Sequence, residues 1–212
     1  LLLSLCFNIA LYVLSNFKEE MLKPIKTVML NKNDSPVMLL ISLNEIKKSS
    51  AKNNFDAQEW SAAWINTLEQ EVGYFSDSDD IHDIKRKKIV IISSSFAEIN
   101  PAFIKKNVEL GKTIVIEKPS VSLASYFGIT LSKEEKAKKI TSGILNGLPL
   151  NCGIQHSSFD GFEVLMKIDT NPAIISKNIG KGKIIFILFD YSKQLVSLQQ
   201  GVPESDYSVK HN

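Results

Sequence analysis

The sequence predicts an α/β fold in which a mainly parallel sheet is flanked by helices and continued by antiparallel strands toward the C-terminus. Three observations support this prediction. Short apolar runs alternate with helical patterns through the first half of the chain, and such alternation is typical of parallel sheets. Closely spaced strand patterns separated by glycines occupy much of the second half. An uncharged apolar run opens the chain and predicts a preceding N-terminal helix.

Four short segments of the first half are predicted as the strands of the parallel sheet. A continuous run of Val, Ile and Leu suits a strand that is buried on both faces, because helices cover both sides of a parallel sheet. Residues 37–41, Ile89–Ile92 and residues 113–116 are runs of this kind, and residues 72–75 are predicted as a further strand.

A long helix is predicted between the first two strands. Asp56 is placed to accept hydrogen bonds from the first turn. Trp60, Trp64 and Leu68 recur four residues apart, so their side chains lie on one face of the helix and are expected to point to the core.

A second helix is predicted to begin at Asn100 and Pro101, because a proline at the first helical position loses no hydrogen bond. Gly111 is predicted to end it. A third helix is expected after Ser120, whose hydroxyl group is placed to cap it.

The second half of the chain predicts an antiparallel extension of the sheet. Strands are predicted at Glu163–Ile168, residues 172–178 and residues 183–189. Gly180 and Gly182 supply the glycines that a tight hairpin turn requires. Residues 192–199 are predicted to form a closing helix.

Residues 1–17 carry no charged side chain. A membrane-spanning helix needs about 20 apolar residues, so this run is slightly short for one. A membrane anchor that is cut at its start is the favoured interpretation, a secretory signal peptide is second, and a buried or amphipathic helix is third. Residues 18–35 are then a linker, residues 36–200 the folded domain and residues 201–212 a tail. The predicted location is therefore a membrane of the cell envelope, with secretion as the alternative.

Composition and charge are those of an ordinary globular protein. The 212 residues are 44% hydrophobic and 23% charged, and the net charge is +2. This net positive charge is too small to predict a nucleic-acid partner. The densest basic cluster, Lys85-Arg86-Lys87-Lys88, leads into a predicted strand and is interpreted as its solvated beginning.

The segments KKIVIISSS, VELGKTIVIEKPS, LASYFGI and NPAIISKNIGKGKIIFILFD resemble the class I glutamine amidotransferase-like fold. The resemblance covers residues 36–200 and is greatest to its non-catalytic branch, exemplified by the trimerisation domain of certain β-galactosidases and by domains attached to polysaccharide deacetylases. It implies a flavodoxin-like parallel sheet and a role in interaction or assembly.

Catalytic members of that wider family place a cysteine on the turn after the strand that corresponds to residues 113–117, and a His-x-Glu pair late in the chain. This sequence has Lys118-Pro119-Ser120 at the turn and no His-x-Glu pair. Cys152 and His156 lie four residues apart, too far apart along a strand to form a dyad. The chain is therefore not predicted to be an enzyme.

Two further groups of residues have the composition of possible binding sites. The acidic segment at residues 77–83 lacks the glycine and the closing glutamate of a calcium loop, so we expect a solvated loop and neither a metal nor a cofactor. Parallel sheets bind ligands beyond the carboxyl ends of their strands. A small-ligand site is therefore placed at Ser94, Ser95, Glu117, Lys118 and Ser120, which are expected to converge there.

These observations lead to one functional hypothesis and two alternatives. The leading hypothesis is a membrane-anchored, catalytically inactive domain that acts as an interaction or assembly module in the cell envelope, with a protein partner or a second copy of itself. One alternative is the N-terminal accessory domain of a carbohydrate-active enzyme such as a polysaccharide deacetylase. The other is a domain that binds a small ligand or a sugar.

Overall fold

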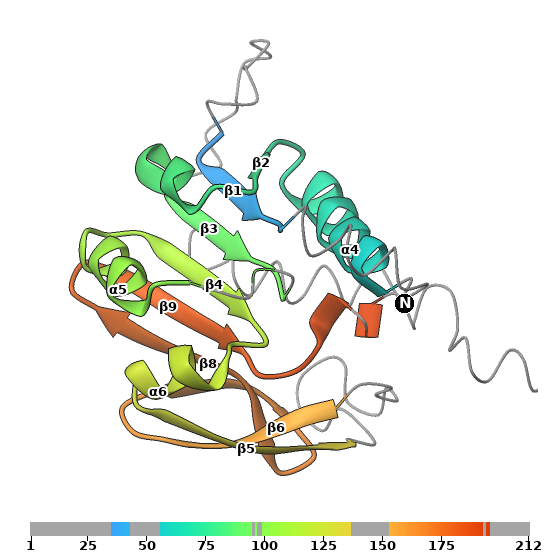
Figure 1. Ribbon diagram of the computed structural model, residues 1–212, viewed down its shortest axis with the longest axis vertical. Helices are drawn as coiled ribbons and strands as arrows, with labels where there is room; N and C mark the ends of the chain where they lie inside the picture. Colours follow the sequence, from blue (N-terminus) through green and yellow to red (C-terminus); the bar gives the residue numbers. More distant parts are fainter. Residues whose placement is uncertain are drawn as a thin grey trace, which may run out of the picture.

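The computed structural model describes residues 35–42, 56–94, 96, 99–136, 153–192 and 194–195. Its centre is a seven-stranded sheet with the strand order β2-β1-β3-β4-β9-β8-β7 (Figure 1). The strands of this sheet are β1 (Val37–Leu40), β2 (Ser76–Ser78), β3 (Ile89–Ile92), β4 (Thr113–Glu117), β7 (Glu163–Ile168), β8 (Asn171–Ile179) and β9 (Gly182–Ile187). Helices α4 (Asp56–Glu71), α5 (Pro101–Glu109) and α6 (Val121–Tyr126) flank it.

The sheet is mostly parallel, as the sequence predicts. Strands β2, β1, β3, β4 and β9 run parallel to one another. Their apolar runs are buried throughout β1, β3 and β4, because each face of the sheet is covered. One register row joins Val37, Ile89, Thr113 and Lys183 at the amino ends of four strands.

The alternation of side chains along each strand creates two hydrophobic cores. On one face, Leu39, Ile91 and Val115 pack with Trp64 of α4 and with Tyr191. The core on the other face is formed with α5 and α6 and includes Leu40, Ile92, Ile104, Ile116, Leu123 and Phe186. The prediction that Trp64 and Leu68 lie on the core side of their helix is confirmed, since both are buried.

The predicted strand at residues 72–75 is wrong, and these residues end a helix instead. The backbone N–H groups of Val72 and Gly73 both donate to the carbonyl of Leu68, at 2.9 and 3.0 Å. Gly73 has a φ of +68°, a left-handed conformation that commonly ends helices. The strand therefore begins only at Ser76, as the short β2.

The boundaries of α5 follow the predicted signals, whereas Asp56, expected to precede and cap the first helix, is itself the first residue of α4. The Asn100 side chain accepts hydrogen bonds from the N–H groups of Ala102 and Phe103, and Pro101 is the first residue of α5. Gly111 follows the helix with a φ of +106°. Ile104 and Val108 are buried on its inner side.

The antiparallel extension is confirmed, with its strands slightly shifted. Strand β8 pairs antiparallel with both β7 and β9. Gly180 and Lys181 form the turn between β8 and β9, since Ile179 pairs with Gly182. Gly180 has a φ of +62°, as tight hairpin turns require. Tyr191, Ser192, Gln194 and Leu195 are helical, so the closing helix begins earlier than predicted, and residues 196–199 lie outside the described part.

A second, two-stranded antiparallel sheet was not predicted. It pairs β5 (Ile129–Lys136) with β6 (Gly153–Phe159) beside α6 and β8 (Figure 1). Phe159 contacts Phe162, which in turn contacts Phe186 of the central sheet, with ring centroids 5.8 and 6.0 Å apart. The prediction failed because the polar second half of β5, Ser132-Lys133-Glu134-Glu135-Lys136, lacks a strand pattern.

The predicted N-terminal helix, the linker and the tail lie outside the described residues, except for Ser35 at the end of the linker. Among the helices that are described, none is both long and apolar enough to cross a membrane. The anchor at residues 1–17 therefore stays a prediction.

Candidate functional site

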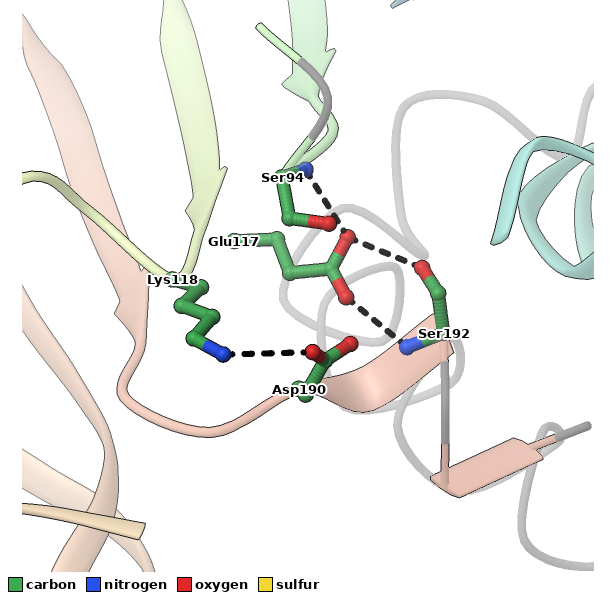
Figure 2. A network of polar contacts seen from close by, with 5 residues as sticks. All are labelled: Ser94, Glu117, Lys118, Asp190 and Ser192. Carbon is green, nitrogen blue, oxygen red and sulfur yellow. Dashed lines mark hydrogen bonds and ion pairs between the residues drawn. The ribbon is translucent and has the colours of Figure 1, made fainter. Parts of the chain in front are cut away.

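The carboxyl ends of β3, β4 and β9 bring five polar residues together (Figure 2). Ser94 follows β3, Glu117 ends β4, and Lys118 begins the turn to α6. Asp190 and Ser192 come from the segment that follows β9. The predicted convergence at this edge is thus partly realised, and we define these five residues as the strand-end cluster.

Glu117 is the centre of the strand-end cluster. Its side chain is 1% exposed and lies on the same face of β4 as Val115, because side chains alternate along a strand. One carboxylate oxygen, Oε2, accepts hydrogen bonds from the Trp64 indole N–H at 2.7 Å, the Ser192 hydroxyl at 2.9 Å and the Ser94 backbone N–H at 3.2 Å. The other oxygen, Oε1, accepts from the Ser192 backbone N–H at 2.8 Å.

These contacts join three parts of the fold that are distant in sequence: helix α4, the end of β3 and the segment after β9. Burial raises the pKa of Glu117, because a charged carboxylate is poorly solvated there. The hydrogen bonds from Ser192 and Trp64 oppose this effect, and repulsion from Asp190 adds to it. Burial is the largest of these causes, so the net direction is upward.

Lys118 occupies the sharp turn from strand to helix. Its φ is +46°, an uncommon conformation for a residue with a side chain. The Lys118 backbone N–H donates to the carbonyl of Ile187 at 2.8 Å. The Lys118 Nζ lies 3.3 Å from Asp190 Oδ2, and the Asp190 side chain is only 5% exposed. An ammonium group held by a carboxylate has no free electron pair, so this geometry does not favour nucleophilic attack by the lysine.

The remaining predicted site residues do not join the cluster in the same way. Ser120 is exposed, and its hydroxyl oxygen accepts from the Leu123 N–H at 3.3 Å and lies 3.1 Å from the Ser122 hydroxyl. It therefore caps α6. Ser94 contributes its backbone, whereas its buried hydroxyl has no hydrogen-bond partner among the described residues. Ser95 lies outside the described part of the chain.

The other residues considered from the sequence are placed elsewhere. Asp80 caps a short 3-10 helix, η2 (Ile81–Arg86), by accepting from the His82 N–H. The Ser78 hydroxyl donates to Asp83 at 2.6 Å. Within the described ranges, no group of three metal-ligating side chains is found. His156 lies in β6, and Cys152 lies just outside the described residues.

Three members of the network around Glu117 were not predicted as site residues: Trp64, Asp190 and Ser192. Asp190 could have been found by the rule that located Ser94, since it follows an apolar strand pattern in the same way. Trp64 was assigned only to the core. Its indole N–H could have been noted, because a buried indole usually needs an acceptor.

No family model matches the sequence, and no curated protein matches it either. Solved structures do share the fold. A catalytic mutant of Gan42B, a GH42 β-galactosidase from G. stearothermophilus, is 15% identical with a TM-score of 0.56, over 82% of this chain and 30% of that one. A β-galactosidase from Rahnella sp. R3 is 13% identical with a TM-score of 0.53, over 82% and 31%. The exo-β-1,4-mannosidase Op5Man5 from Opitutaceae bacterium strain TAV5 is 15% identical with a TM-score of 0.54, over 69% and 29%.

These likenesses establish a fold that is shared with one part of several glycoside hydrolases. The chain spans less than a third of the length of each of these three enzymes. The two β-galactosidase likenesses agree with the resemblance of the sequence to a β-galactosidase domain. The amidotransferase part gains no support from them and stays a prediction.

Proposed function

We propose that this chain is a non-catalytic accessory domain of a carbohydrate-active enzyme. The observation that carries the proposal is the extent of the structural likeness. It covers 82% of this chain but only 30% of the GH42 β-galactosidase Gan42B. A domain that corresponds to so small a share of a glycosidase fits an accessory role better than that of a whole enzyme. Because fold does not fix activity, the site must be considered as well.

The strand-end cluster supports the absence of catalysis. A catalytic carboxylate needs access to a substrate, whereas Glu117 is buried and its oxygens receive four hydrogen bonds from the protein itself. Lys118 is occupied by Asp190. These contacts support a structural role for Glu117 and Lys118 in place of a catalytic one.

The resemblance to the β-galactosidase trimerisation domain implies that the accessory role is assembly. Two exposed apolar side chains of α6 support a contact surface, Val121 at 64% and Tyr126 at 48% exposure. The leading hypothesis from the sequence, a membrane-anchored assembly module, remains a second proposal. The uncharged run at residues 1–17 favours it.

The test compares activity and assembly in the same preparation. The purified full chain is assayed against chromogenic galactosides, mannosides and acetylated glycans, and its mass is measured by light scattering. The proposal expects no turnover, and a glycoside hydrolase or deacetylase domain encoded in the same transcript or its neighbour. Turnover by this chain that disappears in Lys118→Ala but persists in the surface control Lys167→Ala would overturn it.

A further inference from the structure

The amino ends of the parallel strands gather basic side chains that lie far apart in the sequence. Lys88 directly precedes β3, Lys112 precedes β4, and Lys181 and Lys183 lie at the start of β9. The register that pairs Ile89 with Thr113, and Thr113 with Lys183, places these positions on three adjacent strands. Adjacent strands are about 4.8 Å apart, so these residues form a row along one edge of the sheet.

Hydrogen bonds hold this edge together. The Lys112 Nζ donates to the carbonyl oxygens of Ile84, Lys85 and Lys87, at 2.8, 3.0 and 2.7 Å. The Lys183 N–H donates to the Lys112 carbonyl at 3.1 Å. The end of η2, with its basic residues, is thereby fixed beside the beginnings of β4 and β9.

Two of the lysines at this edge are structural and the others remain available. The ammonium group of Lys112 is occupied by its three carbonyl acceptors. Lys87 is buried, and its Nζ donates to the Ser35 carbonyl at 2.9 Å, which corrects the prediction that the whole cluster at residues 85–88 is solvated. The available group, here called the amino-edge cations, consists of the exposed Lys85, Arg86, Lys88 and Lys181 and the half-buried Lys183. Within the described residues, none of these five side chains forms an ion pair. The carboxylate of Glu109 lies at the same edge, but its Oε1 is 4.0 Å from the Nζ of Lys105 in its own helix.

A large apolar side chain is exposed at the same edge, near Lys181. Leu110 is 70% exposed, the highest value among the large apolar side chains that the structure describes. It directly precedes Gly111, and a Cβ atom added to Gly111 would lie 3.7 Å from the Lys181 Cβ. An exposed leucine on the same edge as basic side chains is typical of surfaces that contact the headgroup region of a membrane.

The chain also enters the domain at this edge. The Pro36 carbonyl, just before β1, accepts from the backbone N–H groups of Lys88 and Ile89, at 2.8 and 3.0 Å. The described part of the chain therefore begins, at Ser35 and Pro36, on the side that carries the amino-edge cations.

We propose that the amino-edge cations and Leu110 form a docking surface for an anionic phospholipid bilayer. Lysine and arginine side chains near such a surface are attracted to its negative headgroups, and Leu110 enters the boundary with the acyl chains. A site for single-stranded nucleic acid would instead use aromatic side chains as stacking platforms. This inference concerns a different edge from the strand-end cluster and does not depend on the proposed accessory function.

Lysine footprinting on the full chain tests the orientation. The protein is acetylated in the presence of phosphatidylcholine vesicles, with and without phosphatidylserine, and modification is measured by mass spectrometry. We expect phosphatidylserine vesicles to reduce modification of Lys88 and Lys181 about five-fold. Lys167 is exposed near the C-terminal end of β7, at the edge of the sheet opposite to the amino-edge cations, so its modification should stay unchanged.

A matched pair of variants gives an independent measurement. Lys88→Gln should weaken binding to phosphatidylserine vesicles about five-fold, whereas Lys167→Gln, with the same loss of charge, should not. Equal protection of all three lysines, or equal effects of the two variants, would overturn the proposal. Soluble heparin or an oligonucleotide that protects Lys88 and Lys181 as well as the vesicles do would also overturn it, in favour of a soluble polyanion.

Discussion

Replacement of Glu117 by glutamine tests whether the strand-end cluster is structural. The carboxylate accepts N–H groups on both oxygens: Trp64 and Ser94 on Oε2, and Ser192 on Oε1. A glutamine offers one oxygen and one NH₂ group. In either orientation its NH₂ group faces at least one of these N–H donors, which is then left without an acceptor in a buried place. One such unpaired group costs about 1–3 kcal/mol, so Glu117→Gln should lower the free energy of unfolding by about that amount.

The effect should depend on pH in a defined direction. Burial raises the pKa of Glu117 in the folded state, whereas the unfolded chain has a value near about 4.3. Between these two values the folded state binds more protons than the unfolded state. The stability that Glu117 contributes is thus fully present below about pH 4.3 and is lost as the pH rises through the folded pKa, by at most about 1.4 kcal/mol per pH unit. Glutamine does not titrate, so the deficit of the variant should shrink as the pH rises.

Urea unfolding, followed by circular dichroism from pH 4 to pH 8, measures this deficit. Glu69→Gln is the control, because Glu69 is an exposed residue of α4, and its effect should stay below about 0.5 kcal/mol at every pH. A deficit that grows with pH would refute the reasoning, since it would mean that the four hydrogen bonds outweigh burial. A deficit no larger than that of Glu69→Gln would show that the cluster does not hold the fold together.

Two further predictions concern a glycine in the sheet, Gly182, and the residue that caps α6, Ser120. A Cβ atom at Gly182 would overlap the carbonyl oxygens of Val108 and Lys112, so Gly182→Ala should cost about 3 kcal/mol of unfolding free energy. Gly128→Ala is its control: Gly128 has a φ of +82° but nothing within 4 Å, so backbone strain alone should cost about 1 kcal/mol. Equal losses in urea titrations would contradict the overlap. Ser120→Ala should cost about 1 kcal/mol through loss of the α6 cap and Ser120→Gly only a few tenths, whereas retained stability in both would show that the cap is not needed.

The sequence by itself determined the central strands and the boundaries of α5. The apolar runs at β1, β3 and β4 admit few other structures, because their residues must be buried on both faces. Asn100, Pro101 and Gly111 mark the limits of α5 through local backbone chemistry, and this information is present in the sequence. The strand-end position of Glu117 also followed from pattern alone, since it ends an apolar run.

Only the tertiary structure decided what these residues contact. The partners of Glu117 come from Trp64, which is 53 residues away, and from Ser192, which is 75 residues away, and no local pattern specifies such distant pairing. The same reason explains the unpredicted sheet of β5 and β6, whose pairing depends on contacts across the chain. It also explains the cations at the amino edge, because the strand order β3-β4-β9 places segments that are unremarkable one by one beside each other.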